Sequence, residues 1–367
     1  MEYPDFIDNP LISHEMAVVP HVLIAGNGLA AHVLALFFKK AGIKVKVAGS
    51  FLAGAASPVA YGMINPVHLR TAELAWKAAD LVPYALEFYQ NLQAENPDNP
   101  WFFPAGVTHF CANEEEANLF RMQSESGSLF GWIEWAQDDL SFRIPSAAYI
   151  DTPGLLSALR LSIGASHFQE LTWSYEDFLP ETSGWSFHGE NYSHVIFAEG
   201  FRVLENPYFG AVPFKPNKGQ GIHVKGPEVN SPDCWHKTYF YMGLPGKPWK
   251  IGSTYQARFQ DLDAEAKETE LLLHAAKAHG FDTESYFSWT GIRPASGDRR
   301  PVIGAHPFIS GLYLFNGLGS RGLSTVPAMA EQMTRLIAGN HAVWPEVDII
   351  RFSKRLSHLR HFLAKNP

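Results

Sequence analysis

The chain has 367 residues, 46% of them hydrophobic, and a formal net charge of -8. This length permits a large buried core and favours two lobes over one. The acidic balance argues against a broadly basic nucleic-acid surface and favours small molecules as partners. Cys111 and Cys234 lie far apart without metal-ligand spacing, so the sequence supports neither a disulfide framework nor a metal site and predicts a reducing cytoplasm.

The longest apolar stretch covers residues 22–38 and is interrupted by glycines, Asn27 and His32. A buried strand followed by a helix explains this stretch better than a membrane span, which needs about 20 apolar residues in a row. We therefore expect no membrane association.

The first predicted elements form a βαβ unit. Residues 22–25 predict a buried strand, residues 29–40 a helix that ends at Gly42, and residues 43–47 a second strand. The turn between the first strand and the helix reads Gly-Asn-Gly-Leu-Ala-Ala, which is the spacing of a dinucleotide fingerprint.

Each small residue of this turn has a physical task. Gly26 permits the turn, Gly28 lets the backbone approach a pyrophosphate, and Ala31 lets the helix pack closely on the strand. The helix N-terminus then offers unpaired amides to the phosphates. The acidic residue that binds the ribose is missing, because residues 48–50 read Ala-Gly-Ser. Ser50, Glu199 or a different nucleotide pose are the open alternatives.

The later elements follow in chain order. We expect helices over residues 72–92, with a break or kink at Pro83, and over residues 152–163, 261–279 and 323–337. We expect strands at residues 195–198 and 312–315, and within residues 213–224 and 238–254. A second glycine-rich turn, residues 315–322, joins the last strand to the last helix and again predicts close backbone approach to a cofactor.

Several motifs in order give the chain a family resemblance. They are the opening fingerprint, Gly54–Ser57 with Gly62–Ile64, Asp151–Leu155, Lys218–Gln220, Gly291–Pro294, Asp298–Gly304 and Gly317–Leu323. With these motifs the chain resembles the FAD-dependent oxidoreductases of the D-amino acid oxidase and glycine oxidase family. The wording Gly-Ser-Arg-Gly-Leu at residues 319–323 is most similar to the oxidoreductase half of the bifunctional MnmC enzymes, which modify the tRNA wobble uridine.

The resemblance implies an α/β fold in which a Rossmann-like FAD-binding domain with a parallel sheet is interleaved with a substrate domain on a large mixed or antiparallel sheet. The FAD-binding domain would comprise residues 16–75, 145–205 and 290–345, and the substrate domain residues 76–144 and 206–289. Residues 346–367 would form a C-terminal amphipathic helix packed on the body, or alternatively a basic surface that docks RNA.

The resemblance also implies the site. Arg293 would clamp a substrate carboxylate, with Tyr241 as a second carboxylate ligand. Non-covalent FAD would be held by Gly26, Gly28, Leu29, Ala30, Ala31, Ser50, Ala56, Ser57, Gly62, Met63, Ile64, Glu199, Gly200, Gly317, Leu318, Gly319, Ser320, Arg321, Gly322 and Leu323. The N-terminus of the helix at residues 323–337 would face the flavin and favour negative charge on its reduced form.

The implied activity is oxidation of an amino-acid-like amine that carries a carboxylate, by hydride transfer to flavin N5. The products would be an imine and, with oxygen, hydrogen peroxide, and no general base is nominated. Two alternatives stay open at this point. The chain could be a stand-alone tRNA-modifying oxidase, or a flavin-binding protein without catalysis, as the missing ribose acid suggests.

Overall fold

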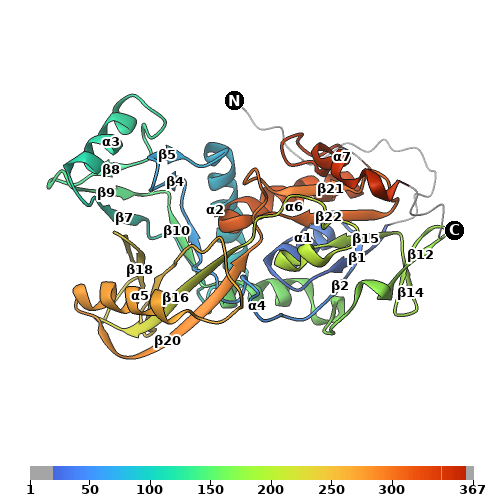
Figure 1. Cartoon of the computed structure of the whole chain (residues 1–367), viewed down its shortest axis with the longest axis horizontal. Helices are drawn as coiled ribbons and strands as arrows, with labels where there is room; N and C mark the ends of the chain where they lie inside the picture. Colours follow the sequence, from blue (N-terminus) through green and yellow to red (C-terminus); the bar gives the residue numbers. More distant parts are fainter. Residues whose placement is uncertain (1–19, 340, 361–367) are drawn as a thin grey trace.

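The computed structural model describes residues 20–339 and 341–360. The described chain forms two lobes side by side (Figure 1), one built on a largely parallel sheet and the other on a larger mixed sheet. Two predicted ends lie outside the described residues. They are the start of the first domain at residue 16 and the end of the C-terminal segment at residues 361–367.

The first lobe contains a six-stranded sheet. Its strands in spatial order are β11 (Phe168–Gln169), β2 (Lys44–Ala48), β1 (His21–Ala25), β15 (His194–Phe197), β22 (Leu312–Asn316) and β21 (Val302–Ala305). The first five strands run parallel, and β21 is antiparallel to β22. The predicted βαβ unit and parallel sheet are thus confirmed. The carboxyl ends of β2, β1, β15 and β22 meet at one edge, where ligands of such sheets bind.

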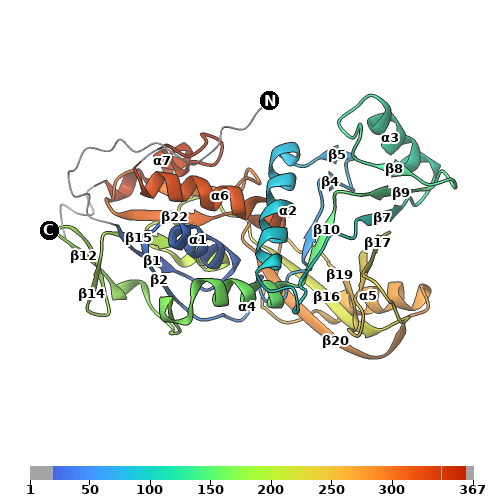
Figure 2. The ribbon, with the colours of Figure 1, turned by 180° about the vertical axis from the view of Figure 1, so that it is seen from behind.

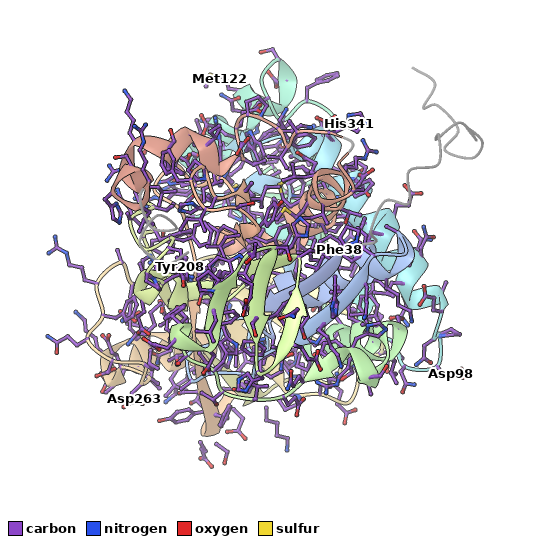
Figure 3. All side chains as sticks on the ribbon, turned by 90° about the vertical axis from the view of Figure 1, so that its right-hand side faces the viewer. Phe38, Asp98, Met122, Tyr208, Asp263 and His341 are labelled. Atoms are coloured by element: carbon purple, nitrogen blue, oxygen red, sulfur yellow. The ribbon has the colours of Figure 1, made fainter. Side chains whose placement is uncertain are left out.

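Helices cover one face of this sheet. They are α1 (Leu29–Lys40), α4 (Thr152–Ile163) and α6 (Gly322–Ile337), and α2 (Ala78–Ala94) packs on α6. Helix α1 packs on α6 and α4, and the buried faces of all four belong to one hydrophobic cluster. Phe38 of α1 points into this interior, whereas Asp98, Met122 and Asp263 lie at the margin of the molecule (Figure 3).

Helix α2 begins at Ala78 and not at the expected residue 72, and the expected break at Pro83 is absent. Pro83 lies inside a continuous helix, because it removes only one hydrogen bond near the helix start. The helix packs on α6 at the junction of the lobes (Figure 2). The Tyr89 hydroxyl of α2 donates a buried 2.9 Å hydrogen bond to the Leu323 carbonyl. Helix α2 therefore braces the start of α6.

The opposite face of the sheet carries an aromatic cluster that includes Trp173, Trp185 and Phe197. A three-stranded antiparallel sheet contributes to it, with strands β12 (Phe178–Glu181), β13 (Gly184–Phe187) and β14 (Glu190–Tyr192). The parallel strands are thus buried on both faces, as their continuous apolar sequences require.

The second lobe contains an eight-stranded sheet. Its strands in spatial order are β20 (Asp282–Arg293), β16 (Asn217–Lys225), β19 (Trp249–Gly252), β18 (Phe240–Gly243), β17 (Asp233–His236), β7 (Val107–Phe110), β9 (Ser141–Ile144) and β8 (Glu134–Trp135). Only the β17–β7 pair is parallel. The predicted large mixed sheet is confirmed, and two separate stretches of the chain, residues 107–144 and 217–293, build it.

Two helices flank this sheet: α5 (Ala266–Ala278) and α3 (Glu114–Glu125). Helix α5 begins later than the expected residue 261. The preceding segment instead wraps around the fully buried Lys218, whose ammonium donates to the carbonyl of Asp263 and pairs with Glu265 at 3.2 Å. Capturing this buried charge holds residues 261–265 out of the helix.

Short strands join the lobes. They are β3 (Met63–Ile64), β10 (Ala148–Ile150) and β6 (Phe102–Phe103) in one sheet, and β4 (Val67–His68) with β5 (Glu73–Leu74) in another. Among the described residues, no helix is both long and apolar enough to span a bilayer.

The C-terminal segment forms short turns of helix where one long helix was expected. They are a 3-10 turn at Ile349–Phe352, α7 (Ser353–Leu356) and a 3-10 turn at Ser357–Leu359. The Asp348 side chain caps the first turn through the Ile350 N–H. Ile349 and Leu356 are buried against the body, so the expected packing is present although the continuous helix is wrong within residues 346–360.

Candidate functional site

One cavity of about 780 Å³ is lined by residues of both lobes. From the first lobe come the loops that follow β1, β2, β15 and β22, represented by Gly28, Ser50, Gly200 and Gly319. From the second lobe come the end of β20 and parts of β17 and β18. The volume falls in the range of cofactor and substrate pockets.

The first glycine turn forms a backbone cradle. A side chain at Gly26 would place its Cβ 2.3 Å from the Ala198 carbonyl oxygen, and the φ of +146° excludes other residues. At Gly28 a Cβ would lie 2.9 Å from Ser57 Oγ, which accepts a 2.9 Å hydrogen bond from the Leu29 N–H. Leu29 and Ala30 line the cavity, whereas Ala31 is fully buried behind them.

The second glycine turn reaches the same cavity. Residues 318–323 all line it, and Gly322 lies beside the Leu29 side chain of the first turn. Gly317 does not line the cavity and serves the turn through its φ of +75°. Asn316, which sequence reasoning missed, donates a 2.9 Å hydrogen bond to the Gly200 carbonyl and accepts from the Gly317 N–H. Its amide thus joins the loops after β15 and β22.

The first turn of α6 faces the cavity through Gly322, Leu323 and Ser324. Its free amides place the positive end of the helix dipole there. The Arg321 guanidinium donates to the Asn65 carbonyl and to His68 Nδ1. Burial lowers the pKa of Arg321 to about 10, and burial together with the Arg321 charge lowers the pKa of His68 to about 4. Arg321 therefore meets a neutral imidazole.

The segment of residues 56–64 divides between wall and core. Ala56, Ser57, Gly62 and Met63 line the cavity. Ile64 does not, because it is fully buried in the core cluster of the first lobe. The family motif therefore places its last residue in packing and not against a ligand.

Glu199 and Ser50 both line the cavity, as proposed for the missing ribose ligand. The two carboxylate oxygens of Glu199 already accept hydrogen bonds, from the Tyr175 hydroxyl at 2.7 Å and from the Asn206 amide at 2.6 Å. Burial nevertheless raises the pKa of Glu199 to about 7. Arg202, whose guanidinium lies 4.1 Å from the Trp173 ring centroid, lines the cavity beside it and was not foreseen.

Arg293 ends β20 on the opposite wall of the cavity. Its guanidinium donates to Asn217 Oδ1 at 2.8 Å, to Ser253 Oγ and to the Thr254 carbonyl. All of these acceptors are neutral, and burial lowers the pKa of Arg293. No ion pair within the described residues neutralises this partly buried cation. Arg293 therefore forms no surface salt bridge with any described residue. An anion in the cavity would neutralise its charge.

Tyr241 does not lie in the cavity lining. Its ring stacks on Trp235 at a centroid distance of 3.8 Å and packs near Phe281 in the core under α5. The alternation of β18 turns Tyr241 to the α5 side, while its neighbour Phe240 lines the cavity. The structure thus contradicts a direct substrate contact for Tyr241, because its side chain points to the wrong face of the sheet.

His109, Cys111 and Glu116 bring metal-ligand types together, with donor atoms within 4.8 Å of one another. Both ring nitrogens of His109 already have hydrogen-bond partners, at His236 and at Glu116. Burial also raises the pKa of the Cys111 thiol to about 11, which disfavours the thiolate that a metal would bind. We therefore assign His109 and Glu116 to a hydrogen-bonded network and Cys111 to packing beside it.

Comparison with known families decides what the glycine cradle serves. Residues 21–336 match the family model described as FAD dependent oxidoreductase. The chain belongs to this family. This match confirms the predicted family resemblance and the predicted FAD cofactor.

Curated relatives of this oxidoreductase include two bifunctional proteins for tRNA 5-methylaminomethyl-2-thiouridine biosynthesis, both named MnmC. The protein from Vibrio vulnificus (strain CMCP6) is 24% identical over 394 residues, which covers 90% of this chain and 57% of the relative. The protein from Actinobacillus pleuropneumoniae serotype 3 (strain JL03) is 23% identical over 270 residues, or 62% of this chain and 38% of the relative. The chain thus spans about half or less of these relatives.

Solved structures share the fold of this oxidoreductase. Iminodiacetate oxidase from Chelativorans sp. BNC1 superposes with a TM-score of 0.73 at 18% identity, covering 89% of this chain and 97% of that one. Glycine oxidase from Geobacillus kaustophilus gives 0.71 at 18% identity, with coverages of 90% and 98%. L-proline dehydrogenase from P. horikoshii gives 0.72 at 15% identity, with coverages of 91% and 98%.

The cavity of this oxidoreductase fits FAD. The two glycine turns leave room for a ligand because they carry no side chains there. At Gly28 a side chain would clash with Ser57. Asn27 Oδ1 is buried on the cavity wall without a hydrogen-bond partner among the described residues, as expected for a group that waits for a ligand. The residues of both turns and of the loop at Ala56 and Ser57 would hold the cofactor.

Proposed function

We propose that this FAD-dependent oxidoreductase oxidises an amine that carries a carboxylate. The observation that carries the proposal is the partly buried Arg293, which lines the cavity and has only neutral hydrogen-bond partners among the described residues. A planar guanidinium binds a carboxylate through two parallel charge-assisted hydrogen bonds. The names of the structural neighbours agree, because iminodiacetate, glycine and proline are all amines with a carboxylate.

The residues of the chain divide the work between the two walls. Arg293 would fix the carboxylate end of the substrate, which orients the carbon that bears the amine. The first turn of α6 would stabilise negative charge at the other wall. Bound FAD supplies the hydride acceptor in this chemistry. Met63, Phe240 and Trp289 line the space between and exclude water from it.

We propose that FAD is held without a covalent bond to cysteine. Cys111 and Cys234 are both buried and do not line the cavity. Their thiol pKa values are raised by burial, to about 11 for Cys111.

The proposal is tested by anaerobic titration of the purified, FAD-loaded chain. Glycine, N-methylglycine, D-alanine and iminodiacetate are compared with methylamine and dimethylamine, which have no carboxylate. We expect the flavin absorption to bleach with at least one carboxylated amine, and at much lower concentration than with the amine that lacks the carboxylate. Bleaching by methylamine or dimethylamine at equal concentration would remove the carboxylate from the proposal.

The curated relatives favour a second candidate, a stand-alone oxidase that acts on the modified wobble uridine of tRNA. The carboxymethylaminomethyl group of such a nucleoside is itself an amine with a carboxylate, so the same cavity chemistry would serve it. Salt-sensitive binding of tRNA, and bleaching by tRNA that carries this group but not by the small amines, would support this candidate over the first.

A further inference from the structure

Three side chains form a hydrogen-bonded line, and the residues at its two ends, His236 and Glu116, both line the cavity. His236 of β17 lines the cavity, and its Nδ1 lies 2.9 Å from Nδ1 of His109 on β7. The parallel pairing of β17 with β7 sets His236 directly opposite His109. The second ring nitrogen of His109, Nε2, lies 3.3 Å from Oε1 of Glu116.

The far end of the line is held in place by the start of α3. The Glu116 N–H donates a 2.9 Å hydrogen bond to the side chain of Asn113, the N-cap of the helix. The other carboxylate oxygen, Oε2, accepts a 2.6 Å hydrogen bond from the Ala112 N–H. This reciprocal capping fixes the direction of the Glu116 carboxylate, and leaves Oε1 for His109.

Hydrogen positions along the line follow from neutral imidazole chemistry. A neutral ring has one N–H and one lone pair. If His109 donates from Nε2 to Glu116, its Nδ1 must accept, and His236 must donate from its own Nδ1. The remaining nitrogen of His236, Nε2, then carries a lone pair on a residue of the cavity wall, and among the described residues it has no hydrogen-bond partner.

We propose that His236, His109 and Glu116 form a proton relay that deprotonates the ammonium form of the substrate before hydride transfer. This inference rests on the proposed function, because only a neutral amine has the lone pair that assists loss of a hydride. It adds to that function a path for the proton.

The relay moves one proton without any change in oxidation state. An N–H bond of the ammonium breaks as His236 Nε2–H forms. The His236 Nδ1–H proton passes to His109 Nδ1, and the His109 Nε2–H proton passes to Glu116 Oε1. The Glu116 side chain is 29% exposed, so it can release the proton to water. After the product leaves, Glu116 takes up a proton from water, the shift runs in reverse, and His236 Nε2 releases a proton to water in the emptied cavity, which restores the first tautomers.

The surroundings of the two histidines keep both rings neutral, so that they can pass a proton on without retaining it. Burial is the largest cause that lowers the pKa of His109, and it lowers the pKa of His236 to about 3 with help from His109. Neither ring therefore holds an extra proton near neutral pH. The other titratable and charged groups at this place are Cys111, beside His109, and Arg121 and Asp138, which act on the Cys111 thiol.

The decisive variant is Glu116→Gln, which keeps the size of the side chain and cannot accept the proton. The matched control is Glu115→Gln, an exposed neighbour on the same helix turn. The rate of anaerobic flavin reduction is measured by stopped flow across pH with glycine, N-methylglycine and iminodiacetate. Melting temperature and flavin absorption verify folding, and His236→Gln provides a second cut in the same line.

We expect Glu116→Gln and His236→Gln to slow flavin reduction about 100-fold below the pKa of the amine. Above that pKa the substrate arrives already neutral, so the rate should return to near the wild-type value. Glu115→Gln should follow the wild-type profile throughout. A structural role would instead lower the rate equally at every pH.

Three results would overturn the relay while the amine-oxidase function stands. They are an unchanged rate in Glu116→Gln, a loss that is equal at all pH values, and a stoichiometric divalent metal in the wild type that Cys111→Ser abolishes. Failure of every amine to bleach the wild-type flavin at any pH would overturn the proposed function, and the relay with it.

Discussion

The Tyr175 hydroxyl donates a 2.7 Å hydrogen bond to Glu199, a partly buried carboxyl that follows β15 on the cavity wall. Burial raises the pKa of Glu199 from 4.5 to about 7 despite this bond and a second one from Asn206. Desolvation of the charged form therefore outweighs both hydrogen bonds.

This carboxyl should make stability depend on pH. Between pH 4.5 and about 7 the folded state binds more protons at Glu199 than the unfolded chain does, so the free energy of unfolding falls as pH rises through this window. The full effect is about 3 kcal/mol. Glu199→Gln should flatten the melting temperature of the cofactor-free chain between pH 5 and 8. Parallel curves for the variant and the wild type would contradict the raised pKa.

The contact between Gly28 and Ser57 predicts a specific rescue. In Gly28→Ala the new methyl group would lie 2.9 Å from Ser57 Oγ, so FAD affinity and melting temperature should fall. Ser57→Ala alone removes the Leu29 hydrogen bond, at a cost of about 1 kcal/mol. The double variant should bind FAD better than Gly28→Ala, because the clash is gone. Additive losses in a fluorescence titration of FAD would show that the two residues do not meet.

Arg293 should discriminate between amines by their carboxylate. Arg293→Ala is expected to raise KM for carboxylated amines about 100-fold, the loss of two charge-assisted hydrogen bonds, and to change KM for methylamine little. Arg293→Lys should recover only part of the affinity, since a lysine lacks the planar fork. The exposed Arg258, outside the cavity lining, is the matched control. Equal effects on both amine classes would remove Arg293 from carboxylate binding.

The cysteines should be dispensable for flavin retention. Cys111→Ser and Cys234→Ser are expected to purify with the same ratio of flavin to protein absorption as the wild type. Acid or heat should release FAD into the supernatant from all three proteins. Flavin that stays with the precipitated wild type but leaves one variant would reveal a covalent bond to that cysteine.

Local signals in the sequence are enough to predict the cofactor lobe. The boundaries of α1 agree with the expected residues 29–40, because a glycine turn starts this helix and Gly42 stops it. The same holds for α6, which begins at the second glycine turn. Such signals depend on backbone conformations that neighbouring residues determine.

Signals that depend on distant contacts were not predictable. Nothing near Tyr241 in the sequence reveals that β18 turns it toward α5 and Trp235. His236 and His109 are 127 residues apart, and only the pairing of β17 with β7 brings them together. Lys218 shortens α5 through a capture that periodicity cannot show. Sheet register and buried charge decide these positions, and neither is written in a local pattern.

The loop before Ser57 and the strand that carries Arg293 are joined by backbone hydrogen bonding. The Ile292 N–H donates to the Gly54 carbonyl at 2.9 Å, and Ala55 forms a bridge with Ile292. These backbone contacts thus connect the loop that carries Ser57 to the strand that carries Arg293. We therefore expect the protein without FAD to bind carboxylate anions more weakly than the FAD-loaded protein. FAD and the carboxylate substrate would then raise each other's affinity.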